Sequence, residues 1–545
     1  MEERYIASVD LGTSKLAVCV SRILGQDVQV IYYKETPSQG IRYSYVNNPG
    51  KVETVLRDAL SQAQQELKIK IQQVIVGLPR YYVRQENASA MMDRTDPDTQ
   101  IEDNEVRTLK SMALEEYPLT DSKNEVIYGA VAQSFSTEDS LNELENDIVG
   151  MTAEKLEGNF KVFIGSRRHS INIDNVFNSM GIAIAKKYFT PGITARAVLK
   201  EEQMENGVAL IDIGAGVSSV TIFKGKIMRY YAAIPFGGNS ITRDIKTECN
   251  FSFELAENIK KAYGACMPGK LSALGEKSIQ IVDENDEPTA QVTVKYISEI
   301  ITARMKEIIE ALLYHIQASG YASEDTLRAG VVVTGGGAEL VNCANYIKDI
   351  SGYSVKIGYP RRFFSCEGCP EAAETSAATS MGMILAAKSD KLLNCVNEAP
   401  ARRYWTAPKP VIQSEAKDLA KDPSESTIPQ DDSMKFTPAI PSDDNRSLSG
   451  AEGLSGAEGP EQEEPAIEAS VIAAQDDGPS VFDPYTPEEI KAAGNRKGPK
   501  AAKPQKPPRE PKSWPKPKFT WFKHIQSTIS KAAGDIFDGM DEEEV

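Results

Sequence analysis

An aspartate just ahead of a glycine turn, near the start of the chain, is the first group of residues that could do chemistry. Asp10 stands two positions before Gly12-Thr13-Ser14-Lys15, a turn whose amides and hydroxyls can face phosphate oxygens while Lys15 supplies positive charge. Asp10 is placed to orient a hydrated Mg²⁺, which binds through one or two carboxylates plus phosphate. An ordinary β-hairpin turn carries the same pattern, so both interpretations stand for this segment alone.

A second segment, about 200 residues later, repeats the layout of an apolar strand, an aspartate and a glycine turn. Its residues are Asp212, Gly214, Ala215, Gly216 and the hydroxyl-bearing Ser218 and Ser219. The duplicated acid-glycine hairpin predicts two similar lobes that face one phosphate chain.

A third glycine turn follows a strand that ends at Thr334. Gly335, Gly336 and Gly337 precede a predicted helix, whose N-terminus would offer amides and a positive dipole to the phosphate and ribose side of a nucleotide. A plain strand-to-helix turn explains one left-handed glycine well and three poorly. Neither G-x-G-x-x-G nor G-x-x-x-x-G-K-[ST] occurs at these turns, so a dinucleotide fold or a P-loop is not supported.

Alternating strands and helices must position these turns. Strands are predicted at 5–9, 74–76, 208–213, 220–223 and 330–334, and helices at 52–67, 253–262, 297–319 and 340–350. The alternation predicts an α/β architecture with mostly parallel or mixed sheets up to about residue 395.

Composition excludes several classes of protein. The 545 residues carry 61 Lys and Arg against 78 Asp and Glu, a net charge of −17, which argues against a general nucleic-acid binder. No run of 18 or more apolar residues occurs, so no ordinary transmembrane helix is expected. The start of the chain does not resemble a secretory signal, and the 7 cysteines are interpreted as reduced thiols of a cytosolic protein.

The charge is unevenly divided after residue 400. Residues 415–489 hold 19 acidic and 4 basic side chains and include the unit LSGAEG twice in tandem, which predicts a disordered linker. Residues 496–531 reverse the balance with 11 basic and 1 acidic side chain, and their proline-rich first part is predicted to be extended.

The last part of the chain predicts an amphipathic helix. Its apolar stripe and flanking aromatic and basic residues include Trp521, Phe522, Lys523, Ile525, Ile529, Ile536 and Phe537. Such a helix could dock on the globular part or lie in a membrane interface, with lysines near anionic headgroups and aromatic rings below them. The long linker favours the membrane, because docking on its own core would not need that reach, and the acidic residues at the end predict modest binding.

The order of the three turns resembles the nucleotide-binding superfamily of actin, sugar kinases and heat-shock chaperones, and within it the FtsA family of bacterial cell-division proteins. IDIGAGVSSVTIFKGKIMRYYAAIPFGGNSITRDI resembles the family's second phosphate turn, and FELAENIKKAYG resembles its adenosine helix. VVVTGGGAEL resembles the adenosine turn, and TSAATSMGMILAA the helix that closes the first lobe. The resemblance covers about residues 4–390, and the terminal helix is similar to the family's membrane anchor.

This resemblance implies an α/β, actin-like two-lobed fold of duplicated ribonuclease-H-like domains with an FtsA-type extra subdomain. The implied parts are subdomain 1A at 1–84 and 366–395, subdomain 1C at 85–175, subdomain 2A at 176–247 and 328–365, subdomain 2B at 248–327, the linker at 396–517, and the membrane-targeting helix with its acidic tail at 518–545.

The resemblance also implies a membrane-tethered, ATP-binding protein that polymerises and anchors FtsZ filaments at the cytoplasmic face of the membrane, at the division site. Implied cofactors are ATP and Mg²⁺, the ion held through water by Asp10 and Asp212. The implied phosphate site comprises Gly12, Thr13, Ser14, Lys15, Gly214, Ala215, Gly216 and Ser218, and the implied adenosine site comprises Glu257, Lys260, Gly335, Gly336 and Gly337. Implied partners are the FtsZ C-terminal peptide, further copies of the chain, an anionic membrane surface and other division proteins, without nucleic acid.

Arg304 lies on a predicted exposed helix face. By the resemblance it would help to bind the acidic FtsZ peptide, and otherwise it is an ordinary solvated charge. Cys366 and Cys369 form a C-x-x-C without the further ligands that zinc needs, so a reduced turn is favoured over a metal or redox site.

The chain departs from the family pattern at two places. Val217 stands where members commonly have threonine, and residues 188–199 offer no Glu or Gln to position an attacking water, so hydrolysis is expected to be slow or absent. A sugar- or acetate-type kinase, a chaperone-like ATPase and a pilus-assembly ATPase of the same superfamily are the alternatives. None of them accounts for both the long linker and the terminal helix.

Overall fold

The computed structural model describes residues 3–282 and 288–396. The predicted linker beyond Val396 and the predicted terminal helix with Trp521 lie outside these residues. Within the described part, no helix is both long enough and apolar enough to cross a membrane.

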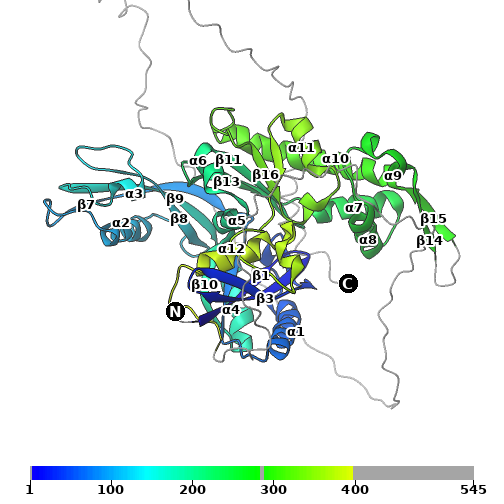
Figure 1. Ribbon diagram of the computed structural model, residues 1–545, viewed down its shortest axis with the longest axis horizontal. Helices are drawn as coiled ribbons and strands as arrows, with labels where there is room; N and C mark the ends of the chain where they lie inside the picture. Colours follow the sequence, from blue (N-terminus) through cyan, green and yellow to red (C-terminus); the bar gives the residue numbers. More distant parts are fainter. Residues whose placement is uncertain (1–2, 283–287, 397–545) are drawn as a thin grey trace, which may run out of the picture. The chain divides into compact units, whose positions relative to one another are not determined.

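The first five-stranded sheet has the order β10-β6-β1-β2-β3 (Figure 1). Its strands are β1 (Glu3–Leu11), β2 (Lys15–Leu24), β3 (Asp27–Pro37), β6 (Gln73–Leu78) and β10 (Ala183–Phe189). β1, β2 and β3 pair as antiparallel neighbours, whereas β6 runs parallel to β1 and β10 parallel to β6. β1 and β6 are almost continuous runs of buried residues, as expected for strands covered on both faces.

The second five-stranded sheet has the order β13-β12-β11-β16-β17. Its strands are β11 (Val208–Ile213), β12 (Ser218–Lys224), β13 (Ile227–Ile234), β16 (Val331–Thr334) and β17 (Val355–Ile357). Three antiparallel strands are again followed by two parallel ones, in the same order as in the first sheet. This repetition confirms the predicted α/β fold of two duplicated domains.

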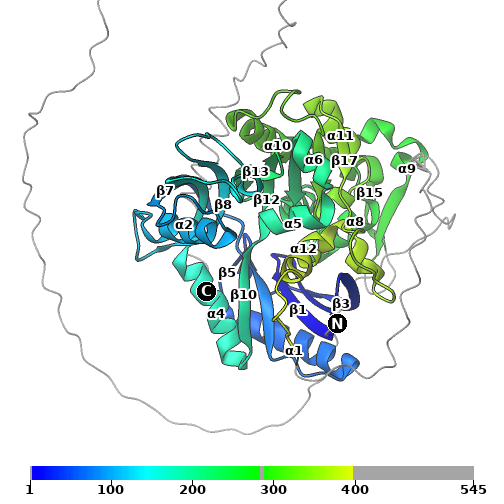
Figure 2. The ribbon, with the colours of Figure 1, turned by 60° about the vertical axis from the view of Figure 1, so that its left-hand side comes forward.

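Helices cover both sheets. α5 (Thr190–Val198) and α12 (Ala378–Ala387) pack together between the sheets, where their buried side chains share one core with Val208 and Leu210 of the second sheet (Figure 2). α1 (Pro49–Leu67) and α4 (Arg167–Met180) pack against each other and on the first sheet, and α7 (Gly238–Cys249) and α10 (Val294–Ala318) do so at the second.

The sequence shows why α1 forms where it does. The side chain of Asn48 accepts a hydrogen bond from the Lys51 amide at 3.1 Å, and Pro49 occupies the first helical turn, where its missing N–H costs nothing. Buried residues recur at helical spacing from Val52 to Leu67, and each large aliphatic one contributes about 1.5–3 kcal/mol by its burial.

A three-stranded sheet of order β7-β9-β8 lies between β6 and β10 in the sequence. Its elements are β7 (Arg84–Asp93), α2 (Asp103–Glu115), β8 (Glu125–Ser136), α3 (Glu145–Ile148) and β9 (Lys155–Ser166). It has its own hydrophobic core, which includes Leu109, Phe135 and Phe160. The segment corresponds in position to the extra subdomain expected at 85–175.

Shorter elements complete the described residues. They are β4 (Ile41–Arg42), β5 (Tyr45–Val46), α6 (Glu201–Asn206), α8 (Phe253–Tyr263), α9 (Ser272–Glu276), β14 (Ser278–Val282), β15 (Pro288–Thr293) and α11 (Cys343–Ser351), with 3₁₀ helices η1 (Pro268–Lys270), η2 (Gly336–Glu339), η3 (Pro370–Ala373) and η4 (Thr375–Ala377).

Two expectations differ from the structure. The boundary expected at 175/176 falls inside α4, and β10, expected in the second lobe, pairs with β6 in the first sheet because its register with β6 extends that sheet. The helix expected from 340 begins only at Cys343, because Val341 pairs with Ala265 and Asn342 adopts a left-handed conformation.

Candidate functional site

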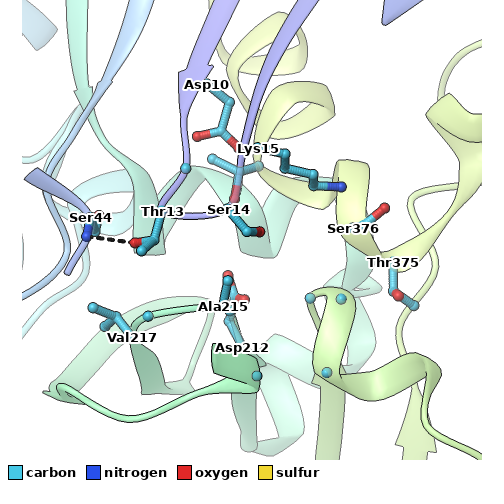
Figure 3. Close-up of a pocket in the computed structure, with 18 of the residues that line it drawn as sticks. Asp10, Thr13, Ser14, Lys15, Ser44, Asp212, Ala215, Val217, Thr375 and Ser376 are labelled. Carbon is cyan, nitrogen blue, oxygen red and sulfur yellow. Dashed lines mark hydrogen bonds between the residues drawn. The ribbon is translucent and has the colours of Figure 1, made fainter. Parts of the chain in front are cut away.

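The three glycine turns line one pocket of about 580 Å³, a volume within the range of small-molecule sites. Figure 3 shows Asp10, Ser14 and Lys15 on one side, with Ala215, Val217 and Asp212 facing them from the other. The pocket therefore brings together segments about 200 residues apart, as the duplicated layout predicts.

The first turn is held by contacts within its own lobe. Thr13 Oγ1 accepts a hydrogen bond from the Ser44 amide at 3.0 Å (Figure 3). Lys15, expected at the phosphates, forms an ion pair with Glu35, which also accepts a hydrogen bond from the Tyr33 hydroxyl at 2.6 Å. Lys15 lines the pocket with its charge already shared.

The second turn approaches the first so closely that it needs glycine. A Cβ added at Gly216 would lie 2.7 Å from Thr13 Oγ1, closer than real Cβ contacts. Gly214, Ala215 and Val217 line the pocket as well. Ser218, expected at the phosphates, is fully buried in β12 and is absent from the pocket lining, because its register in β12 turns its side chain into the protein.

Asp212 meets a cation that the motifs did not indicate. Arg80 Nη1 donates to Asp212 Oδ2, and the two side chains are 15% and 9% exposed. Burial lowers the pKa of Arg80, but Asp212 and Asp10 more than offset this, so that the pKa lies above its usual value. Burial raises the pKa of Asp10, with Arg80 and Lys15 opposing the rise.

The third turn sits against the second through Gly335. Gly335 has a φ of +84°, and a Cβ there would lie 2.5 Å from Asp212 Oδ1 and 2.6 Å from Ile213 O, so only glycine fits. Gly335, Gly336 and Gly337 all line the pocket, but the chain continues into η2 rather than directly into an α-helix. Amides near the pocket therefore come from a 3₁₀ turn.

Glu257 and Lys260 of α8 form a buried polar network at the pocket. Lys260 Nζ donates to Glu257 Oε2 at 2.6 Å, to Thr242 Oγ1 at 2.9 Å and to Gly238 O at 3.1 Å. Burial alone would raise the pKa of Glu257, but Lys260 and Thr242 lower it below its usual value. Burial lowers the pKa of Lys260 in spite of Glu257.

The chemistry of the lining fits a nucleotide. Thr190 at the start of α5 lines the pocket, is 2% exposed, and its hydroxyl has no hydrogen-bond partner in the structure, so a polar ligand group would satisfy it. Asp10 and Asp212 supply two carboxylates, the number through which a largely hydrated Mg²⁺ binds beside phosphates. In the described part of the chain, three or more metal-binding side chains do not gather at any one place.

Several lining residues escaped the sequence analysis, among them Glu35, Ser44, Arg80, Glu339 and Thr375. Thr375 Oγ1 donates to Glu339 Oε1 at 3.1 Å, which joins the third turn to the segment before α12. None belongs to a glycine motif. The conspicuous clue was the position of Arg80 two residues after a buried parallel strand, since loops at strand C-termini carry ligand contacts.

Other candidate residues lie away from the pocket lining. Arg304, expected on an exposed face, is 27% exposed and forms hydrogen-bonded ion pairs with Asp244 and Glu307, because α7 packs beside α10. Cys366 and Cys369 are free thiols, and burial raises the pKa of each.

Comparison with known proteins identifies the family. Residues 209–382 match the model of the family described as cell division protein FtsA. The chain is 27% identical over 390 residues to the cell division protein FtsA of Neisseria meningitidis serogroup B, covering 71% of this chain and 91% of that protein. It is 26% identical to the FtsA of Pseudomonas aeruginosa over 70% of this chain and 89% of that protein.

The chain belongs to the FtsA family. A role in cell division on an actin-like scaffold follows from this membership. Among solved structures, a PilM-PilN type IV pilus biogenesis complex has a TM-score of 0.50 and 13% identity, over 70% of this chain and 98% of that one. At that identity the likeness shows the fold alone.

Proposed function

We propose that the chain binds ATP with Mg²⁺ in this pocket and, as a polymer on the membrane, anchors FtsZ filaments at the division site. The observation that carries the proposal is the convergence of three separate glycine turns, two aspartates and one orphaned hydroxyl on a single pocket between duplicated sheets. A structural role alone would explain close packing of the turns but not two carboxylates aimed at one space.

The adenosine end of the pocket is formed by the second lobe. Gly335 to Gly337 let the base and ribose lie against the backbone, while Glu257 and Lys260 offer one acceptor and one donor. Because Glu257 is ionised and Lys260 is held at three oxygens, the pair is pre-organised before a ligand arrives.

The phosphate end is formed by both lobes. Amides and hydroxyls of Gly12 to Ser14 face those of Gly214 to Gly216, and Lys15 adds charge once it turns from Glu35. Asp10 and Asp212 would hold the hydrated Mg²⁺, which supplies charge neutralisation at the phosphates. α5 carries Thr190 but no carboxylate or amide side chain, which supports slow or absent hydrolysis.

Membrane tethering is supported by the sequence after Val396. The predicted apolar stripe through Phe522, Ile525 and Ile529 and the basic residues around it suit an anionic interface. Head-to-tail association of many copies, in which the β7–β9 subdomain would take part, would make many weak contacts act together by avidity.

Arg304 remains a proposed contact for the acidic C-terminal peptide of FtsZ. Asp244 and Glu307 already accept its hydrogen bonds, so an acidic peptide would have to share or displace them. That competition favours a weak contact, of the kind that a polymer strengthens by repetition.

Co-pelleting with anionic vesicles and purified FtsZ, with and without ATP, tests the proposal. Deleting residues 519–545, or changing Phe522→Ser with Ile525→Ser, is expected to release the protein from vesicles while ATP binding is unchanged. Ser527→Asn, on the polar side of the predicted helix, is the matched control and should pellet as the parent does. Unchanged pelleting of the deletion would contradict membrane tethering, and failure of the parent to bind ATP by calorimetry would contradict nucleotide binding.

A further inference from the structure

Arg80 brings a positive charge to the place where two aspartates would hold a metal ion. Its guanidinium pairs with Asp212 Oδ2, and a Cβ added at Gly214 would lie 3.7 Å from its Nη2. The side chain therefore extends from the first lobe to the second phosphate turn. Both members of the ion pair line the pocket.

The backbone of Arg80 is fixed from both lobes. Its amide donates to Ser44 Oγ at 3.1 Å, and its carbonyl accepts a hydrogen bond from the Tyr231 hydroxyl at 2.5 Å. Ser44 in turn donates to Thr13 of the first turn at 3.0 Å. Arg80 is thus pre-organised at the pocket, unlike a surface arginine whose side chain samples many rotamers.

The surrounding loops hold unusual backbone conformations. Tyr43, Ser44 and Tyr82 have φ values of 47°, 69° and 53°, in the left-handed region that residues other than glycine rarely adopt. Such conformations persist where neighbouring contacts over-determine them, and they cluster at ligand clamps and switches. Here they flank the Ser44–Arg80 contact.

A buried ion pair is weak support for stability, because desolvation of both charges offsets much of their attraction. The same Asp212 oxygen cannot be fully engaged by a guanidinium and by the water shell of a divalent ion. Retaining Arg80 at this position therefore sets up a competition between two cations for one carboxylate.

We propose that Arg80 is an internal cation that competes with a divalent metal ion for Asp212 and thereby sets how strongly nucleotide binding depends on the metal. This inference rests on the proposed nucleotide function of the pocket. In the competition, Arg80 must release Asp212 before the metal is fully held, and the released guanidinium is then close to the phosphate turns. The intrinsic affinity for the metal is reduced by the fraction of protein in which the pair is formed.

Mn²⁺ binding to nucleotide-stripped, full-length protein tests the competition directly, with free Mn²⁺ measured by electron paramagnetic resonance. Arg80→Ala should bind one Mn²⁺ at least about tenfold more tightly than the parent, since Asp10 and Asp212 lose their cation. Adding Asp212→Asn to Arg80→Ala should return the affinity to the parent's level. Arg84→Ala, which removes an arginine paired with Glu125 outside the pocket, is the matched control and should leave Mn²⁺ binding unchanged.

Equal Mn²⁺ affinity of the parent and Arg80→Ala, within twofold, would overturn the proposal. If Arg80→Ala does not fold, Arg80→Gln removes the charge while keeping a hydrogen-bond donor, and the same comparison decides. A nucleotide arm measures ATP affinity with Mg²⁺ and with a chelator, and the ratio should be larger in the variant than in the parent. A parent that binds no ATP would refute the proposed function, whereas the Mn²⁺ comparison still decides the role of Arg80.

Discussion

The two lobes repeat one strand order but differ at the turn after their first strand. In the hairpin registers Asp10 pairs with Ala17 and Asp212 with Ser219, so the two aspartates are equivalent. Counting two residues back from each partner aligns Lys15 with Val217. The first lobe thus has a cation where the second has a buried apolar side chain.

The turn after the fourth strand differs in the same sense. Val9 pairs with Val76 in the first sheet and Ile211 with Val333 in the second, so that Arg80 and Gly337 follow their strands at equivalent distances. The first lobe again has a cation, and the second has a glycine. Duplication of the fold has therefore been followed by division of roles: one lobe supplies positive charge, and the other supplies close backbone approach.

The largest expected effect comes from removing the cation that crosses between lobes. Arg80→Ala should lower the free energy of unfolding by about 3–5 kcal/mol at neutral pH, because Asp212 is left buried without its partner. Arg84→Ala, whose side chain is 36% exposed, should lower it by at most about 1 kcal/mol. Urea unfolding followed by circular dichroism measures both, and similar losses would remove the distinction between the cross-lobe pair and an ordinary one.

A smaller effect is expected from adding a side chain to the glycine lobe. Gly335→Ala should lower the free energy of unfolding by about 1–3 kcal/mol, because its positive φ and the nearby Asp212 oxygen leave no room for a methyl group. Gly336→Ala has its nearest neighbour at 4.0 Å and should change stability by less than about 0.5 kcal/mol. The same urea titration compares them, and equal costs would mean that close approach is not what selects these glycines.

The smallest effect concerns pH and the ion pair of the second lobe. Glu257→Gln should cost about 1 kcal/mol at neutral pH, where the ionised carboxylate is held by Lys260. Since the pKa of Glu257 is lowered in the folded protein from the usual 4.5, this contribution is present above that pH and is lost as the pH falls below it. Parent and variant should therefore converge in stability at acid pH, and a difference that persists there would show that packing, not ionisation, is responsible. Glu35→Gln, from the more exposed pair of the first lobe, serves as the comparison.

Local patterns predicted the strands and the glycine turns well, because buried β-branched runs and acid-glycine hairpins are properties of adjacent residues. β11 was predicted with its observed bounds, whereas β1 and α10 were predicted a few residues short or shifted at their ends. Ser218 was misplaced because alternation along β12 decides which hydroxyls reach the pocket. Arg80 and Glu35 were missed because their importance depends on which strands lie side by side.

By itself, the sequence determined the duplicated fold, the three turns and the change of charge along the chain, since periodicity, glycine spacing and composition are written in neighbouring residues. Only the tertiary structure decided that β10 completes the first sheet, that Lys15 is paired with Glu35, and that Arg80 reaches Asp212. Each of these joins residues far apart in the sequence, and electrostatic pairing in a buried site depends on distance in space.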